Sequence, residues 1–299
     1  MATFGVNLSF AVKRWPEPEV WAAFVRQELE VELVQFSFDL LDPWWPDELS
    51  RPLAKRVRAA VAAEGLTLHS TFVGLAAYTY NGLLHPDAEG RRATELWFER
   101  ASDLAAEMGA RAIGGPVGGV SVQQFTQSPA NVRQYDDLIH TFGNLTAYAK
   151  RAGLEEWLIE PTPLKRELPW TVSGAQQLLH DLEDVAALPV RYALDVGHAL
   201  YRPLYGPEAS LEPWLDLGQH IGLVHVQQTD GESDSHWGFA RPGIVDVGAL
   251  AAQLERVSVH VPVILEVFYP FEQDDEAVQR DLIASVEHCR LALEHAAQT

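Results

Sequence analysis

Cysteine is almost absent from this chain of 299 residues. The single cysteine, Cys289, has no partner for a disulfide within the chain, and one cysteine cannot build a cysteine-rich metal site. A chain without disulfides suits a reducing compartment. Residues 1–7 also lack the basic segment and apolar run of a signal peptide. We therefore expect a cytoplasmic protein.

Basic residues and long apolar runs are also scarce. The chain has 22 Lys and Arg against 42 Asp and Glu, and its formal net charge is −20. A field of that sign repels phosphate backbones and anionic membrane surfaces, so we expect no nucleic-acid partner. No segment approaches the roughly 18 consecutive apolar residues that a membrane span needs, so we expect no membrane partner. A small anionic substrate is still compatible with this net charge, because a few basic side chains near the site can attract it at short range.

What the chain does have is an alternation of short apolar runs with longer amphipathic segments. The runs predict eight strands at Phe4–Ser9, Leu33–Ser37, Thr67–Phe72, Ala112–Gly114, Trp157–Glu160, Tyr192–Asp195, Gly222–Val226 and Val263–Val267. The segments predict helices over about 17–29, 47–64, 87–108, 131–152, 171–186, 212–219, 246–256 and 272–296. Glycines such as Gly109 and Gly153 are expected to end helices, because glycine accepts a left-handed cap.

This alternation predicts an α/β protein with a parallel sheet built from βαβ units. No G-x-G-x-x-G motif follows the first strand, which counts against a dinucleotide-binding fold. Eight repeats favour closure, so we predict a single (β/α)₈ TIM barrel domain over residues 1–299. The longest irregular segments all follow predicted strands, on the face where active sites of such barrels lie: 72–86, 114–130, 161–170, 199–211 and 227–245.

The last four predicted strands each end in a residue that can bind a metal. These residues are Glu160, Asp195, His225 and Glu266, separated by 35, 30 and 41 residues, or about one βα unit each. A single glutamate at the end of a strand is commonly a solvated loop residue. A single histidine there is commonly a hydrogen-bonded core residue. Four on consecutive strands of a closed barrel would converge on one point, and each follows an apolar run, where an unpaired charge is costly.

A divalent cation would neutralise these three carboxylates, which otherwise repel one another. Three oxygen ligands and one nitrogen ligand suit Mn²⁺ or Mg²⁺ first, and Co²⁺ or Zn²⁺ are also compatible. We therefore expect one divalent ion, with Mn²⁺ as the first choice.

These motifs resemble the xylose isomerase-like TIM barrel superfamily. Within it, the chain is similar to the group of sugar and sugar-phosphate isomerases and epimerases that includes D-tagatose 3-epimerase, and it also resembles the erythrulose-phosphate epimerases. The resemblance covers essentially the whole chain and is carried by Glu160-Pro161-Thr162, Asp195-Val196-Gly197-His198, His225 and Glu266. It implies that these four ligands hold one divalent ion.

The resemblance also implies a reaction. Glu160 and Glu266 would be the acid/base pair on opposite faces of a ketose or ketose phosphate, and epimerisation at C3 would pass through a metal-stabilised enediolate. Returning the proton at C1 or C2 on one face would instead make the enzyme an aldose–ketose isomerase. The sequence does not distinguish these outcomes.

Further residues are candidates for binding substrate. His198 would orient a ligand or meet a substrate hydroxyl, and a phosphate would need basic groups in the loops. The candidates are His198, His69, Glu167, His236, Arg241, Lys165 and Arg166. The tagatose-epimerase pattern has an arginine six residues after the metal-binding histidine, but this chain has Gly231 there. The basic candidates are equally compatible with plain surface charge.

A DNA-repair function is a distant alternative, because endonuclease IV resembles the same superfamily. Asp234-Ser235-His236 matches the D-x-H pair of that enzyme, so binding of a second metal by Asp234 and His236 stays open. The fourth predicted strand, however, ends in Gly114-Gly115 without a histidine, and the net charge opposes DNA binding. A sugar-binding barrel without activity is a third reading. We also expect a homo-oligomer, a dimer or tetramer. The paired Trp44 and Trp45 are equally compatible with such an interface and with a wall of the substrate pocket.

Overall fold

The computed structural model describes residues 3–126 and 128–296. Its eight strands follow one another in chain order around a closed barrel, and every pair whose register is described is parallel. The predicted α/β class and (β/α)₈ TIM barrel are therefore confirmed. The strands are β1 Phe4–Asn7, β2 Leu33–Ser37, β3 Thr67–Phe72, β4 Ala112–Gly115, β5 Glu156–Ile159, β6 Val190–Asp195, β7 Ile221–Val226 and β8 Val263–Leu265.

Helices occupy the connections between strands. The longer ones are α1 Pro18–Gln27, α2 Asp47–Ala63, α4 Ala88–Met108, α6 Ser128–Ala152, α7 Val172–Leu182, α11 Val247–Arg256 and α12 Asp275–Ala296. The short α-helices are α3 Leu75–Tyr78, α5 Val122–Thr126, α8 Val196–Ala199, α9 Arg202–Tyr205 and α10 Glu212–Leu215. Three 3₁₀ helices are η1 Leu8–Ala11, η2 Gly82–Leu84 and η3 Gly218–His220.

Local sequence explains several of these boundaries. Pro18 begins α1, where its missing N–H costs no helical hydrogen bond. Gly109 ends α4 with a φ of 87°, a left-handed conformation that glycine adopts without a steric cost. Gly153 follows α6 with a φ of 107°. The predicted helix stops at these two glycines are therefore confirmed.

Some predicted boundaries were wrong. The first strand ends at Asn7, because the Asn7 side chain accepts a hydrogen bond from the N–H of Ser9 and starts η1. The predicted helix over 212–219 is two separate turns, α10 and η3, since Gly218 adopts a φ of 52° that no α-helix contains. Strands β5 and β8 end one residue before Glu160 and Glu266, which therefore follow the strands.

The structure divides into two compact units. Unit 1 holds the described residues up to Phe36, Ala59–Leu68 and the described residues from Ala193 onward. Unit 2 holds Ser37–Arg58 and His69–Tyr192. The interpretation of residues 1–299 as one domain stays a prediction. Within the described ranges, no helix has the length and apolar character that crossing a bilayer requires.

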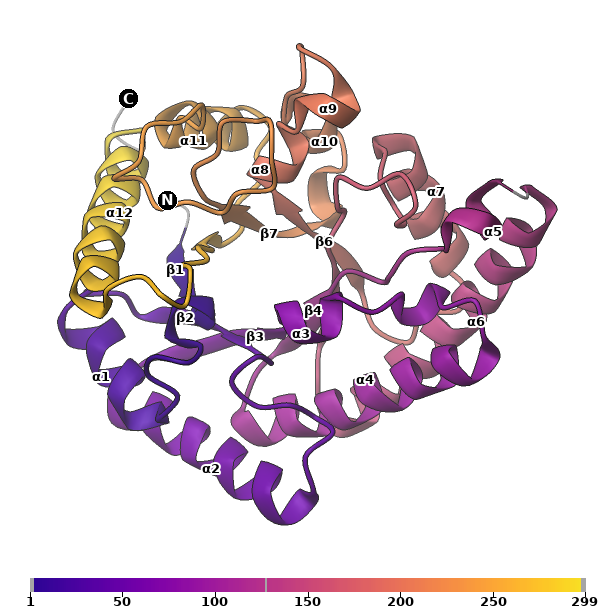
Figure 1. Cartoon of the computed structure of the whole chain (residues 1–299), viewed down its shortest axis with the longest axis horizontal. Coiled ribbons are helices and arrows are strands. Elements are labelled where there is room, and N and C mark those ends of the chain that lie inside the picture. Colours follow the sequence, from indigo (N-terminus) through magenta and orange to yellow (C-terminus); the bar gives the residue numbers. More distant parts are fainter. Residues whose placement is uncertain (1–2, 127, 297–299) are drawn as a thin grey trace. The chain divides into compact units, whose positions relative to one another are not determined.

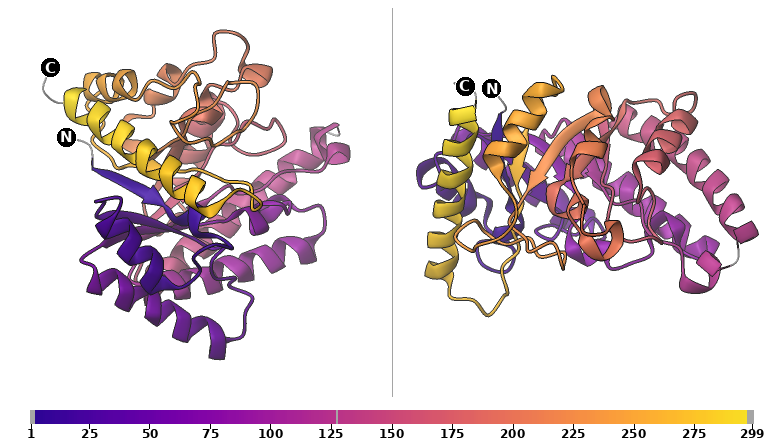
Figure 2. Two further views of the ribbon diagram at one scale, coloured as in Figure 1. Left: turned by 60° about the vertical axis from the view of Figure 1, so that its left-hand side comes forward. Right: turned by 90° about the horizontal axis from the view of Figure 1, so that it is seen from above.

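In unit 1, β8 lies between β1 and β7. Val263 pairs with Phe4 on one side and with Val224 on the other. Helix α12 lies beside β1 (Figure 2) and packs against α11 (Figure 1). Val278 and Leu282 of α12 are fully buried, so the helix covers the sheet with its apolar side.

In unit 2, β4 lies between β3 and β5. Helices α4 and α6 run side by side outside these strands (Figure 1). Their contact with the sheet is aromatic: the ring of Trp157 on β5 lies 5.2 Å from Phe98 of α4 and 5.8 Å from Phe142 of α6. Such tilted and edge-on pairs are the preferred arrangements of aromatic rings.

Candidate metal centre

Asp195 is the last residue of β6 and caps the helix that follows. Its Oδ1 accepts hydrogen bonds from the backbone N–H of His198 at 2.8 Å and from Nε2 of Gln227 at 2.6 Å. Its Oδ2 is buried, and no residue in the described part of the chain donates a hydrogen bond to it. A buried carboxylate oxygen without a donor is costly. A bound cation would remove that cost.

His225 lies on β7 and is completely buried. Its Nε2 faces Oε1 of Gln35 at 2.8 Å, and its Nδ1 faces Oε2 of Glu266 at 3.2 Å. Because the Gln35 oxygen can only accept, Nε2 carries the ring proton. In the neutral ring, the lone pair of Nδ1 then faces a carboxylate. This pairing is favourable only with a proton or a cation between the two atoms.

Glu266 directly follows β8 and is oriented by residues at the start of the chain. Its Oε1 accepts a hydrogen bond from Nδ2 of Asn7 at 2.9 Å. The same Asn7 nitrogen lies 2.7 Å from Oε1 of Gln35, the atom that faces His225. Asn7 and Gln35 therefore orient two candidate ligands, as partners of metal ligands commonly do.

The sequence analysis did not single out Asn7 or Gln35. The signal for them was present: each is the only side-chain amide in a mostly apolar strand, FGVN and LVQFS. Both are buried, and a buried amide needs partners.

The three residues of unit 1 meet the requirements of a metal site. Asp195, His225 and Glu266 each offer one ligand atom, and these atoms lie within 4.8 Å of one another. All three side chains are buried. Two carboxylates and one imidazole with a fixed tautomer form a donor set for a divalent cation. This buried cluster of acids and histidine can hold one metal ion.

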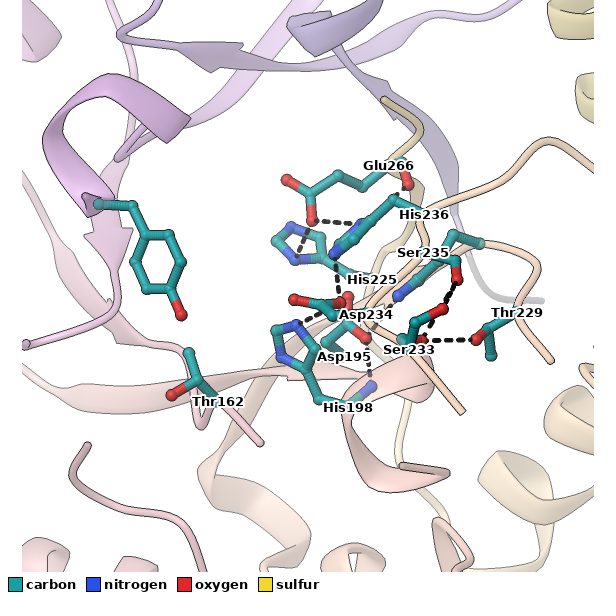
Figure 3. Close-up of polar contacts among 12 residues, drawn as sticks. Thr162, Asp195, His198, His225, Thr229, Ser233, Asp234, Ser235, His236 and Glu266 are labelled. Atoms are coloured by element: carbon teal, nitrogen blue, oxygen red, sulfur yellow. Dashed lines mark hydrogen bonds and ion pairs between the residues drawn. The ribbon is translucent and has the colours of Figure 1, made fainter. Parts of the chain in front are cut away.

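A second polar group joins two residues of the loop between β7 and α11, Asp234 and His236, to His198 of α8 (Figure 3). Oδ1 of Asp234 is 3.2 Å from Nε2 of His198 and 3.0 Å from Nε2 of His236. Burial by itself disfavours the charged forms, but the attraction between the carboxylate and the two rings outweighs it. The pKa of Asp234 is therefore held well below its usual range, and that of His236 is raised to about 10. Ligand atoms of Asp195, His198 and His236 also lie within 4.8 Å of one another.

Gly231 occupies the position where the resembled epimerases have an arginine. Its φ is 77°, which disfavours any other residue. A Cβ atom built there would lie 2.8 Å from Cδ1 of Ile244 and 3.1 Å from the carbonyl oxygen of Leu200. A side chain at residue 231 would therefore crowd its neighbours. In this chain the polar side chains of the loop, Asp234 and His236, lie three and five residues further on.

Unit 2 contains four of the predicted site residues in a buried or partly buried setting. Glu160 follows β5 and is 7% exposed. Glu167 accepts hydrogen bonds from the hydroxyls of Thr162 and, at 3.4 Å, Tyr78. His69 lies on β3 with its Nδ1 3.1 Å from the hydroxyl of Ser70. Arg166 donates to the carbonyl of Val120 at 2.9 Å.

The two other basic candidates contact aromatic rings. Nζ of Lys165 lies 6.0 Å from the ring centre of Trp170 in unit 2. The guanidinium of Arg241 lies 3.2 Å from the ring centre of Trp237 in unit 1. Such cation–π contacts hold a side chain in place while leaving its N–H groups able to donate. Binding of substrate by these residues stays a prediction.

Comparison with known proteins identifies the family. The family model of xylose isomerase-like TIM barrels matches residues 27–288. The chain therefore belongs to the xylose isomerase-like TIM barrel family, and the predicted resemblance is confirmed. The solved structure of a candidate xylose isomerase from Rhodospirillum rubrum is 41% identical, with a TM-score of 0.94 over 97% of this chain and 99% of that one.

Two named epimerases are more distant relatives. D-erythrulose 1-phosphate 3-epimerase from Brucella abortus (strain 2308) is 22% identical over 239 residues, which are 79% of this chain and 77% of that protein. The solved structure of an L-ribulose 3-epimerase is 23% identical, with a TM-score of 0.72 over 100% of this chain and 96% of that one, and shows the same fold. These relatives are sugar epimerases and isomerases, consistent with an isomerase-class enzyme.

Proposed function

We propose that this protein is a metal-dependent 3-epimerase of a ketose or ketose phosphate, with a tetrulose phosphate as the first substrate to test. The observation that carries the proposal is the buried cluster of Asp195, His225 and Glu266, whose ligand atoms lie within 4.8 Å of one another. The relatedness to D-erythrulose 1-phosphate 3-epimerase supports the choice of substrate.

We propose Glu160 as the fourth metal ligand. Ile159, the residue before it, pairs with Tyr192 of β6, and Asp195 ends that same strand. The carboxyl ends of neighbouring barrel strands meet at one rim, where residues from several strands build the active site. The Glu160 carboxylate is buried, and a divalent ion shared with Asp195 would offset the cost of burying these charges.

The proposed reaction needs two proton carriers and one source of positive charge. When bound, the divalent ion polarises the ketose carbonyl and stabilises the enediolate. One of Glu160 and Glu266 takes the proton from C3, and the electron pair of the broken C–H bond moves toward the carbonyl. The other carboxylic acid returns a proton to C3 from the opposite face. The electron pair returns from the carbonyl to form the new C3–H bond, and the configuration of C3 is inverted.

An aldose–ketose isomerase is the second candidate function. The relative with 41% identity is a candidate xylose isomerase, and the same carboxylates can move a proton between C1 and C2. Hydrogen exchange separates the two reactions. In deuterated water, a 3-epimerase places deuterium at C3 of the recovered ketose, whereas an isomerase that works by proton transfer places it at C1 of the ketose or at C2 of the aldose.

The first prediction concerns Glu266. We expect Glu266→Gln to lower kcat by about 100- to 10,000-fold, the usual contribution of general acid–base catalysis, because an amide cannot carry the proton. The variant should keep the far-UV circular dichroism of the wild type. Glu232→Gln is the matched control, because Glu232 is an exposed glutamate that pairs with Arg202. Near-normal turnover by the Glu266 variant would show that its assigned role is wrong.

The second prediction concerns phosphate recognition. We propose that Lys165, Arg166 and Arg241 bind the phosphate of the substrate, since charged N–H donors recognise phosphate best. Replacing all three with alanine should raise KM for D-erythrulose 1-phosphate by at least about tenfold, the loss expected for one charge-assisted hydrogen bond. The KM for free D-erythrulose, measured on the same variant, is the internal control. Equal effects on both sugars would contradict phosphate binding.

Mn²⁺ is the proposed ion, because an oxygen-rich donor set with one imidazole suits it. Mg²⁺, Co²⁺ and Zn²⁺ are the ions to compare by activity after removal of metal with a chelator. A cytoplasmic location and a dimeric or tetrameric assembly belong to the same proposal. The single cysteine supports the location, and size-exclusion chromatography with light scattering tests the assembly.

A further inference from the structure

The carboxylate of Asp234 lies between two imidazole rings. Its Oδ1 is within hydrogen-bond distance of Nε2 of both His198 and His236, at 3.2 and 3.0 Å. The two rings stand nearly perpendicular, with centres 5.6 Å apart (Figure 3). A carboxylate can only accept, so each of these Nε2 atoms carries a proton. One acceptor therefore fixes the orientation of both rings.

Each of these histidines also contacts a residue of the metal cluster. Nδ1 of His236 is 3.3 Å from the backbone oxygen of Glu266 and 3.6 Å from its Oε2. The backbone N–H of His198 donates to Oδ1 of Asp195 at 2.8 Å. Asp234 is therefore linked, through one histidine each, to two of the candidate metal ligands.

Backbone hydrogen bonds hold the loop around Asp234 in place. His236 adopts a φ of 44°, unusual for a residue with a side chain. Its carbonyl accepts from the N–H of Phe268 at 3.0 Å, and the next residue, Trp237, exchanges two backbone hydrogen bonds with Gln228. Strain of this kind persists only where neighbouring contacts determine the conformation. The loop is thus built to hold the histidine and its carboxylate partner.

We infer that Asp234 is a positioning residue, which acts on the substrate through His198 and His236 by fixing the orientation of their rings. The inference rests on the proposed epimerase function, because it assumes that the substrate lies beside the metal cluster. Asp234 itself has a side chain that is 40% exposed. It is thus accessible to water, and its replacement leaves no buried cavity.

A double-mutant cycle tests whether Asp234 acts through His198. We expect Asp234→Ala to lower kcat/KM by about 10- to 100-fold, the usual effect of losing a partner that orients an active-site group. In the His198→Ala background the same change should lower kcat/KM by a smaller factor than in the wild type, because only the link through His236 is left to lose and coupled residues are not additive. Asp230→Ala is the matched control: Asp230 lies in the same loop and accepts from the N–H of Glu232. Full additivity of the two changes would overturn the inference.

Nuclear magnetic resonance of the histidine rings gives a readout that needs no turnover. In the Mg²⁺-loaded protein, long-range ¹H–¹⁵N spectra assigned with His198→Ala and His236→Ala should show Nε2 protonated in both rings. Asp234→Ala should shift both sets of signals, and Asp230→Ala should shift neither. Unchanged signals in the Asp234 variant would overturn the inference. If the wild type turns over no ketose or ketose phosphate, the proposed function fails, and these spectra still decide whether Asp234 orients the rings.

Metal analysis tests a different role for the same side chains, the binding of a second metal ion. If Asp234 only positions the two rings by hydrogen bonds, Asp234→Ala should leave the number of divalent ions per chain unchanged. Two ions per chain in the wild type and one in the variant would mean that this group binds a second metal ion. That result would overturn the positioning role.

Discussion

At the scale of single residues, the orientation of His225 is the feature on which the proposed metal binding depends. Oε1 of Gln35 accepts a hydrogen bond from the Nε2–H of His225 at 2.8 Å, so Nδ1 is the atom available to a metal. We expect Gln35→Met, which keeps the length of the side chain but removes the acceptor, to weaken metal binding by about 10- to 100-fold. Isothermal titration with Mn²⁺ measures this. Gln27→Met is the control, because Gln27 is exposed and contacts Glu64. Equal affinities in both variants would contradict the assigned tautomer.

The sequence predicted the candidate metal ligands better than the residues that hydrogen-bond to them. Asp195, His225 and Glu266 were identified because each ends an apolar run, and the structure brings their ligand atoms together. Asn7 and Gln35 were missed because a lone amide in a strand has many explanations until its neighbour is known. Asn7 of β1 hydrogen-bonds to a residue about 260 positions later along the chain. Such a contact depends on tertiary structure, which the periodicity of apolar residues does not report.

At the scale of secondary structure, helix α7 shows how one side chain sets a boundary. The hydroxyl of Thr171, the residue before the helix, accepts from the N–H of Gly174 at 3.0 Å. We expect Thr171→Ala to lower the free energy of unfolding by about 0.5–2 kcal/mol, because an N–H of the first turn loses its partner. Urea titration followed by circular dichroism measures the change. Thr171→Ser keeps the hydroxyl and should lose less than half as much; equal losses would rule out the cap as the cause.

The sequence predicted the long helices and missed the short ones. Helices such as α2 and α4 span several turns, so their apolar positions recur often enough to reveal a period of 3.6 residues. Helices α3, α5, α8 and α9 have four or five residues each, too few for a periodic pattern. They lie in the irregular segments that follow strands. At α8 the side chain of Asp195 caps the first turn, and such a local hydrogen bond leaves little trace in hydropathy.

At the scale of the whole molecule, the two compact units are interwoven along the chain. The boundaries between them at residues 36/37, 58/59, 68/69 and 192/193 fall inside β2, α2, β3 and β6. Independent domains are instead joined at exposed linkers, where few contacts cross. A unit that ended at these boundaries would contain strands with part of their residues missing. The interpretation of the chain as one domain, which rested on the alternation of strands and helices, stays a prediction.

We therefore expect the whole chain to unfold in one cooperative transition. If four elements contribute residues to both units, loss of either unit disrupts strands of the other, and no half-folded state should be stable. Incorporation of 5-fluorotryptophan gives separate probes: Trp21 is buried in unit 1 and Trp157 in unit 2. Their native ¹⁹F signals, assigned with Trp21→Phe and Trp157→Phe, should disappear at the same urea concentration, and calorimetric and van't Hoff enthalpies should agree. Separate midpoints for the two signals would show that the units fold independently and that the single-domain prediction is wrong.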